Sequence, residues 1–119
     1  MATTATPTKI HASDAAGGLY TGIFTLALDT TDANGELTCD LTSYFKYIYG
    51  AVDIGATGTT GYVFQVEKPA YNTAITSTNV KIGVYEAGAD AAALDAVAST
   101  DVSAYSPGLT IMVWGRQAI

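Results

Sequence analysis

The feature that most constrains the fold is an alternation of apolar and polar residues along several short stretches of the chain. It is clearest over residues 61–67, 79–86 and 108–115. A repeat of two residues is the period of a β-strand with one buried face. Because such stretches follow one another at close spacing, separated by turns rich in Gly, Asn, Asp and Thr, we expect an all-β sandwich or barrel.

The composition limits the classes of partner. The chain has 119 residues, which suits one domain, and only 13% of them are charged, against about a quarter in a typical protein. Five basic residues face eleven acidic ones, for a net charge of −6. We expect no binding to nucleic acid, because a basic footprint is missing and the acidic field repels phosphate. A weakly charged surface rich in Thr and Tyr suits packing against other protein, and its acidity suits a basic partner.

Cysteine and hydropathy indicate the compartment. Cys39 is the single cysteine, so no disulfide forms within the chain and an oxidising compartment is not indicated. The first residues have neither the basic segment nor the apolar segment of a signal peptide. No apolar run approaches the roughly 20 residues that cross a bilayer. We therefore expect synthesis in the cytoplasm and no membrane partner.

The full pattern predicts a single antiparallel β-sandwich or jelly roll of about seven or eight strands over residues 9–119, after a flexible arm at residues 1–8. Strands are expected at residues 9–13, 19–29, 36–41, 46–54, 61–67, 79–86, 94–97 and 108–115. Residues 87–98 fit either an Ala-rich helix or a loop with a short strand, and Gly88 favours the second.

Two connections carry specific signals. Asn34-Gly35 predicts a tight hairpin between the strands on either side of it, because both positions tolerate positive φ. Residues 42–45 predict one helical turn, capped by Thr42 or Ser43. A further turn is expected at residues 15–18, a turn or one helical turn at residues 100–103, a flexible loop at residues 55–61 and a longer connection at residues 68–77.

The residues that could support catalysis or metal binding are few. His11 is the single histidine and no nucleophile motif surrounds it, so we interpret it as an ordinary strand residue. Cys39 alternates with two leucines and is expected in the core. Asp29, Asp32, Asn34 and Glu36 offer oxygen ligands but miss the spacing of a calcium loop, which favours a turn. The glycines at 55, 58 and 61 lack the lysine of a phosphate loop. We expect no enzyme activity, no cofactor and no metal.

The aromatic residues are the strongest candidates for an interaction site. The chain has eight tyrosines and one tryptophan, and such residues are enriched in protein interfaces and also fill cores or stack on sugars. An interface between proteins is favoured over a plain core role and over carbohydrate binding. The candidate interface residues are Tyr44, Phe45, Tyr47, Tyr49, Trp114 and Arg116.

The order of elements resembles that of a family of small structural proteins from tailed-bacteriophage virions. The resemblance covers about residues 36–116 and depends on short Gly-based motifs rather than a diagnostic one. The motifs are a turn at Leu41-Thr42, strands opening at Gly61 and Val80, the segment Leu94–Val97, a turn at Thr100–Ser103, and a closing strand that runs into Gly115-Arg116. The family is that of capsid decoration, or cement, proteins and other minor virion proteins.

The resemblance implies a function without turnover. Such a protein would be made in the host bacterial cytoplasm and would lie on the capsid exterior of the phage. It would bind the major capsid protein, bridge its subunits and associate as a homotrimer. The N-terminal arm, with Thr3, Thr4, Thr6 and Pro7, is the candidate capsid-binding segment. The alternative is a tail or fibre component that binds a host carbohydrate through its aromatic residues.

Overall fold

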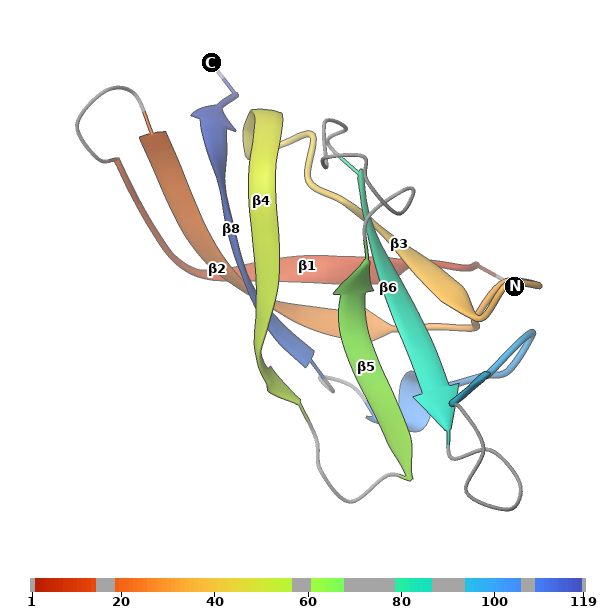
Figure 1. The fold of residues 1–119 in the computed structure, drawn as a ribbon. Coiled ribbons are helices and arrows are strands. Elements are labelled where there is room, and N and C mark those ends of the chain that lie inside the picture. Colours follow the sequence, from red (N-terminus) through yellow and green to blue (C-terminus); the bar gives the residue numbers. More distant parts are fainter. Residues whose placement is uncertain are drawn as a thin grey trace.

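The computed structural model describes residues 2–14, 19–56, 61–67, 79–86, 94–105 and 109–118. These residues form eight β-strands (Figure 1) and one short 3₁₀ helix at Ser103–Tyr105. The strands are β1 Ala5–Asp14, β2 Leu19–Leu28, β3 Glu36–Asp40, β4 Phe45–Ala56, β5 Tyr62–Glu67, β6 Asn79–Glu86, β7 Asp95–Ala96 and β8 Leu109–Gln117.

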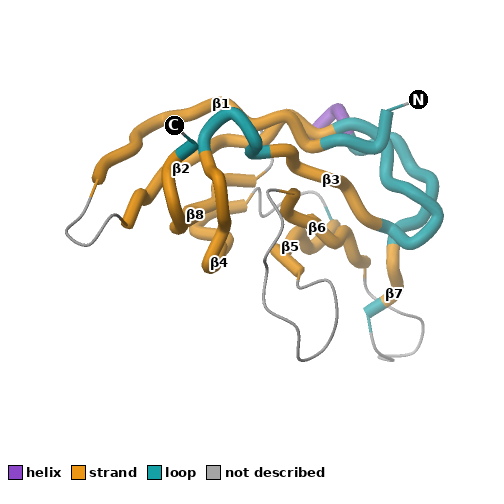
Figure 2. The backbone as a smooth tube through the Cα atoms, turned by 90° about the horizontal axis from the view of Figure 1, so that it is seen from above, coloured by secondary structure: helices purple, strands orange, loops and turns teal. Residues whose placement is uncertain are grey.

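The strands build two antiparallel sheets that pack against each other. The first sheet has the order β1-β2-β8-β4, and the second has the order β3-β6-β5, with β7 paired to β6. Every strand pair is antiparallel. In Figure 2, β5 and β6 lie beside the curved sheet that contains β2, β8 and β4. The prediction of an all-β sandwich is confirmed.

The core between the sheets follows the alternation read from the sequence. Each strand with a clear period of two turns its apolar positions inward, as expected for a strand with one buried face. The buried set includes Phe24, Leu26 and Leu28 on β2, Leu37 and Cys39 on β3, Phe64 on β5, Val80, Ile82 and Val84 on β6, and Leu109, Ile111 and Val113 on β8. The short strand β7 also agrees with the loop-and-strand interpretation of that region.

The predicted flexible arm is wrong for residues 5–8. They form the first half of β1, where Thr6 pairs with Ala27 and Pro7 with Leu26, and Ala5 is buried. Residues 2–4 are also held, since the carbonyls of Ala2 and Thr4 accept hydrogen bonds from Thr30 and Asp29. A Thr-rich segment of low hydropathy becomes a strand here because β2 offers it an unsatisfied edge.

The predicted hairpin at Asn34-Gly35 is also wrong. The flanking strands β2 and β3 belong to different sheets, so they do not pair with each other. Gly35 does adopt positive φ (76°), and its carbonyl accepts a hydrogen bond from Val84 of β6. The segment therefore turns the chain from one sheet to the other, because β3 finds its partner in β6, far along the sequence.

The helical turn before β4 is present in a reduced form. The carbonyl of Leu41 accepts hydrogen bonds from the amides of Tyr44 and Phe45, and β4 begins at Phe45. The capping residue is Asp40 rather than Thr42 or Ser43, because its carboxylate accepts from the Thr42 amide and hydroxyl. The predictions for residues 15–18, 68–77, 87–93 and most of 55–61 lie outside the described residues.

Candidate interaction surface

The outer strand β4 carries a cluster of exposed apolar side chains, which we call the β4 patch. Its members and their exposed fractions are Tyr47 (49%), Tyr49 (54%), Val52 (40%) and Ile54 (51%). They are four of the seven large hydrophobic residues that are exposed in the described part of the chain. Because β4 lies at the end of its sheet and no described strand pairs with its outer side, the patch combines apolar side chains with a sheet edge that is open among the described residues.

Irregularities in β4 explain why the patch is exposed. The register with β8 shifts at three places, which skip Lys46, Tyr49 and Ile54. Each bulge puts an extra residue outside the regular ladder and changes the face to which the next side chains point. A simple alternation over residues 46–54 therefore assigns the faces of β4 incorrectly: Ile48 is buried, whereas Val52 and Ile54, at the same parity, are exposed.

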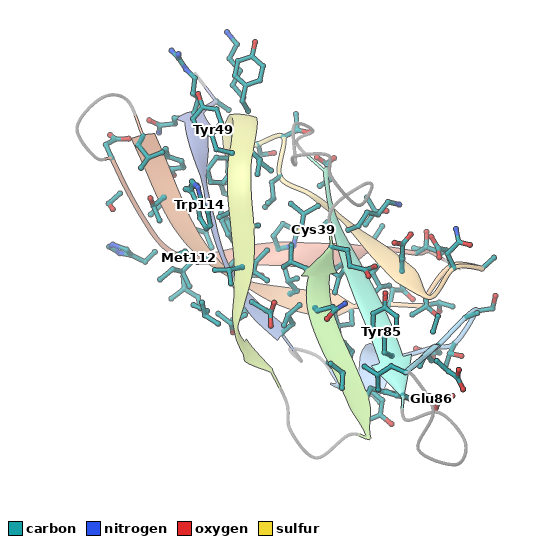
Figure 3. The ribbon with its side chains drawn as sticks, viewed as in Figure 1. Cys39, Tyr49, Tyr85, Glu86, Met112 and Trp114 are labelled. Carbon is teal, nitrogen blue, oxygen red and sulfur yellow. The ribbon has the colours of Figure 1, made fainter. Side chains whose placement is uncertain are left out.

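The outer face of the first sheet extends the patch across the neighbouring strand. Ile23, Met112 and Val52 lie in one row across β2, β8 and β4. In the next row Trp114 lies opposite Gly50, and its ring occupies the space where a side chain at position 50 would stand. Figure 3 shows Met112 and Trp114 along β8 and Tyr49 toward one end of β4. This face thus presents aromatic and aliphatic groups with few charges.

Two of the predicted interface residues are not at the surface in the expected way. Phe45 is fully buried, with its ring centroid 5.3 Å from that of Tyr20 and 6.2 Å from that of Phe24. It faces inward because the first bulge of β4 follows it. Tyr44 is half-buried and packs on Phe24, with ring centroids 4.9 Å apart. Phe45 is therefore a core residue, and Tyr44 mainly covers the core.

The remaining predicted interface residues do come together. Tyr47 pairs with Arg116 across β4 and β8, so the two lie on the same face of the sheet. Arg116 is exposed, Trp114 is partly exposed, and the Lys46 ammonium lies 5.7 Å from the centroid of the Tyr47 ring. An exposed contact of this kind contributes about 0.5–1 kcal/mol and favours one ring orientation.

The candidate capsid-binding residues have structural partners instead. Thr3 accepts a hydrogen bond from the Thr38 amide through its carbonyl, and Thr4 forms a parallel bridge with Thr38. Thr6 and Pro7 lie within β1. Their backbone joins the first sheet to β3, and the side chains of Thr3, Thr4 and Thr6 remain exposed.

A second cluster, on the outer face of the second sheet, was not predicted. The side chains of Glu36 on β3 and Glu67 on β5 interact, and the Tyr85 hydroxyl donates a hydrogen bond to Glu67. The Glu67 carboxyl lies over Gly83, where a Cβ atom would be 2.5 Å away. No sequence signal joins Glu36 to Glu67, because each is placed by its own pairing with β6.

This cluster changes the proton affinity of its members. Burial, then the hydrogen bond and charge of Glu67, raise the pKa of Glu36, while Lys81 acts in the opposite direction. The hydrogen bond to Glu67, together with burial, raises the pKa of Tyr85 to about 12. Among the described residues, no group of three or more His, Cys, Asp or Glu side chains is placed to hold a metal ion.

The other residues considered from the sequence have plain structural surroundings. Cys39 is fully buried, and burial, with a smaller effect from Asp40, raises the pKa of its thiol to about 12. The Asp32 carboxylate accepts hydrogen bonds from the amides of Asn34 and Glu36. Such bonds from an Asp side chain to the following backbone are typical of a turn. His11 is exposed on β1 opposite Ile23.

Comparisons of the chain with protein-family models, with curated proteins and with solved structures found no match. None of the helical segments that the structure describes has the length and hydropathy of a membrane span.

Proposed function

We propose that this chain is a structural protein of a tailed-phage virion, which binds the outer surface of the capsid and stabilises the shell by bridging major capsid subunits. The observation that carries the proposal is the β4 patch, an open sheet edge with exposed aromatic and aliphatic side chains. Burial of such surface between proteins is favourable and needs no chemical step. The order of elements that resembles decoration proteins supports the same proposal.

The proposal includes self-association and a place on the capsid exterior. Many weak contacts, each repeated by the symmetry of the shell, add to a strong attachment. Because residues 2–8 are part of the folded structure, the proposal does not assign capsid binding to a free arm. The trimer that the resemblance implies stays a prediction.

The experiment that tests the proposal is a count of this chain per major capsid protein in purified virions, by quantitative mass spectrometry. Hundreds of copies in a simple ratio to the shell protein would support decoration. A handful of copies would contradict it and move the protein to the tail or to a single vertex. Absence from the particle would contradict any role in the virion.

A second candidate is a tail or fibre component that binds a host carbohydrate. The observation in its favour is the exposure of two neighbouring tyrosines, Tyr47 and Tyr49, since sugars stack on exposed aromatic rings. A glycan array and calorimetric titration with host polysaccharide would test it. Binding that is lost in Tyr47→Ser and Tyr49→Ser, and kept in Val63→Ser on the other sheet, would favour this candidate.

A further inference from the structure

The turn at residues 32–36, which leads from one sheet to the other, is held together by Asp32, and we call it the Asp32 turn. The Asp32 carboxylate accepts hydrogen bonds from the amides of Asn34 (2.8 Å) and Glu36 (3.0 Å). The Asp32 carbonyl accepts one from the Gly35 amide, with 3.1 Å between oxygen and nitrogen. Asn34 is exposed, whereas Gly35 is buried. An asparagine in contact with water is therefore followed by a glycine whose amide is held inside the turn.

The fold requires glycine at position 35. Its φ of 76° lies in the region that residues with a side chain rarely adopt. An added Cβ would also lie 2.9 Å from the Cβ of Ala96 and 3.0 Å from the Val97 nitrogen. The residue after Asn34 is thus fixed by packing as the one that hinders access to its own amide nitrogen least, because it has no Cβ.

An asparagine followed by glycine can undergo deamidation, a spontaneous hydrolysis that makes asparagine a thermally labile residue. The Gly35 amide nitrogen loses its proton and bonds to Cγ of Asn34, the bond from Cγ to Nδ2 breaks, and Nδ2 takes up a proton and leaves as ammonia. Water then opens the cyclic imide at either carbonyl, which produces aspartate or isoaspartate at position 34. The overall reaction consumes one water, releases one ammonia and needs no oxidant or reductant.

The hydrogen bonds of the Asp32 turn oppose the first step of this reaction. The Gly35 N–H keeps its proton while it donates to the Asp32 carbonyl. The Asp32 carboxylate, bonded to the amides on either side of Gly35, also repels a negative charge on that nitrogen. We propose that Asn34 is a deamidation site that the Asp32 turn protects, so that modification proceeds from the locally opened turn. This inference depends only on the turn and is independent of the proposed function.

Deamidation at this position would alter the junction between β3 and β6. The Gly35 carbonyl accepts a hydrogen bond from the Val84 amide of β6, and isoaspartate would insert an additional main-chain carbon directly before Gly35. Either product would place a new negative charge close to Asp32 and Glu36, which already repel each other. The modified protein is therefore expected to be less stable than the unmodified protein and to separate from it on an anion-exchange column.

The test follows the folded wild-type chain at mildly alkaline pH over several weeks, by peptide mapping with mass spectrometry and an enzymatic assay for isoaspartate. Asn34 is expected to become modified, while Asn79, which precedes the β-branched Val80, stays intact as an internal control. Asp32→Ala removes the side-chain acceptor and should speed modification of Asn34 in the folded protein by roughly fivefold or more. Asp32→Asn keeps an oxygen acceptor at the same place and should restore most of the protection.

The matched control is Asp40→Ala, which removes a corresponding carboxylate acceptor, that of the Thr42 amide, and should leave the rate at Asn34 unchanged. Circular dichroism checks that each variant is folded. The wild-type chain unfolded in urea, a measurement that needs no variant, should be modified at least roughly tenfold faster than the folded chain. Equal rates in the folded and unfolded chain, or in wild type and Asp32→Ala, would overturn the proposal. So would an Asn34 that stays unmodified in every folded sample.

Discussion

At the scale of single residues, Gly50 and Trp114 show how one side chain depends on the absence of another. The Trp114 ring lies on the backbone at position 50, and a Cβ there would be 2.3 Å from the ring atom Cζ2. Such a distance is far inside contact distance, so the ring must move if any side chain is added. The glycine at position 50 is therefore required by close packing across β8 and β4.

We predict that Gly50→Ala lowers the free energy of unfolding by about 1–3 kcal/mol, as overpacking does. It should also shift the emission of Trp114, the only tryptophan of the chain, because the ring becomes more exposed. Urea unfolding followed by fluorescence measures both effects. Gly55→Ala is the matched control on the same strand, since nothing lies within 4 Å of an added Cβ there. Equal stability of the two variants would contradict the packing argument.

The Glu36–Glu67 pair gives a prediction about pH. The pKa of Glu36 is raised above its ordinary value of 4.5, so the folded state holds the proton more tightly than the unfolded state. The resulting stabilisation is complete below that value and is lost as the pH rises through the folded-state pKa. Glu36→Gln should therefore increase stability at pH 7 by a few tenths of a kcal/mol to about 1 kcal/mol, with little gain at pH 4.

The control for this prediction has the opposite sign. Hydrogen bonds from the Thr42 hydroxyl and amide lower the pKa of Asp40. Its contribution is present above its ordinary value of 3.8 and is lost as the pH falls through the folded-state pKa. Asp40→Asn should therefore reduce stability at pH 7. Urea titrations of both variants at the two pH values measure the effects, and a Glu36→Gln protein less stable than wild type at pH 7 would disprove a raised pKa of Glu36 in the folded state.

At the scale of elements, residues 2–4 connect the two sheets through main-chain hydrogen bonds, and we call this segment the N-terminal strap. The carbonyls of Ala2 and Thr4 accept hydrogen bonds from Thr30 and Asp29 beyond the end of β2, and the carbonyl of Thr3 accepts one from Thr38 of β3. Residues 2–4 are thus bound on two sides through main-chain atoms. Their side chains, which are exposed, contribute little to this arrangement.

We predict that a variant beginning at Ala5 loses about 1–3 kcal/mol of stability, because three main-chain donors lose their acceptors. Urea unfolding measures the difference from the full chain. The double variant Thr3→Ala, Thr4→Ala keeps every carbonyl and should stay within about 0.5 kcal/mol of wild type. A free arm, as the sequence predicts, would make the truncated chain as stable as the full one.

The elements also show what the sequence can and cannot predict. Strands β2, β6 and β8 can be predicted from their alternation of apolar and polar residues. In each of them, every second side chain faces the core, so the sequence pattern and the structure have the same period of two residues. The partner of β3 does not follow, since Asn34-Gly35 describes only the local turn and the choice of β6 depends on the whole fold. The bulges in β4 cannot be predicted from the sequence pattern either. Because of them, Phe45 is buried while Val52 and Ile54 are exposed. The pairing of Glu36 with Glu67 depends on both registers at once.

At the scale of the whole molecule, the two sheets share one core and differ in charge. Residues from both sheets, such as Phe24 of β2 and Ile82 of β6, belong to a single buried cluster. The acidic residues are concentrated on the strands of the second sheet, while the exposed apolar groups of β4 lie on the first. The shared core favours cooperative folding, and the unequal surfaces give the molecule two faces of different character.

The chain offers one natural probe in each sheet for testing this cooperativity. Trp114 reports on the first sheet by its fluorescence. Cys39 reports on the second by its reaction with a thiol reagent, because a fully buried thiol whose pKa is about 12 does not react in the folded protein at pH 8. Because removal of either sheet would expose the common core and break the N-terminal strap, we predict that both signals change with the same midpoint in urea, as in a two-state transition.

Pulse labelling of Cys39 and fluorescence of Trp114 in the same samples, with far-UV circular dichroism as a third measure, test this directly. Reaction of Cys39 at a lower urea concentration than the change at Trp114 would mean that the second sheet opens while the first persists, and the sandwich would then consist of two cooperative units.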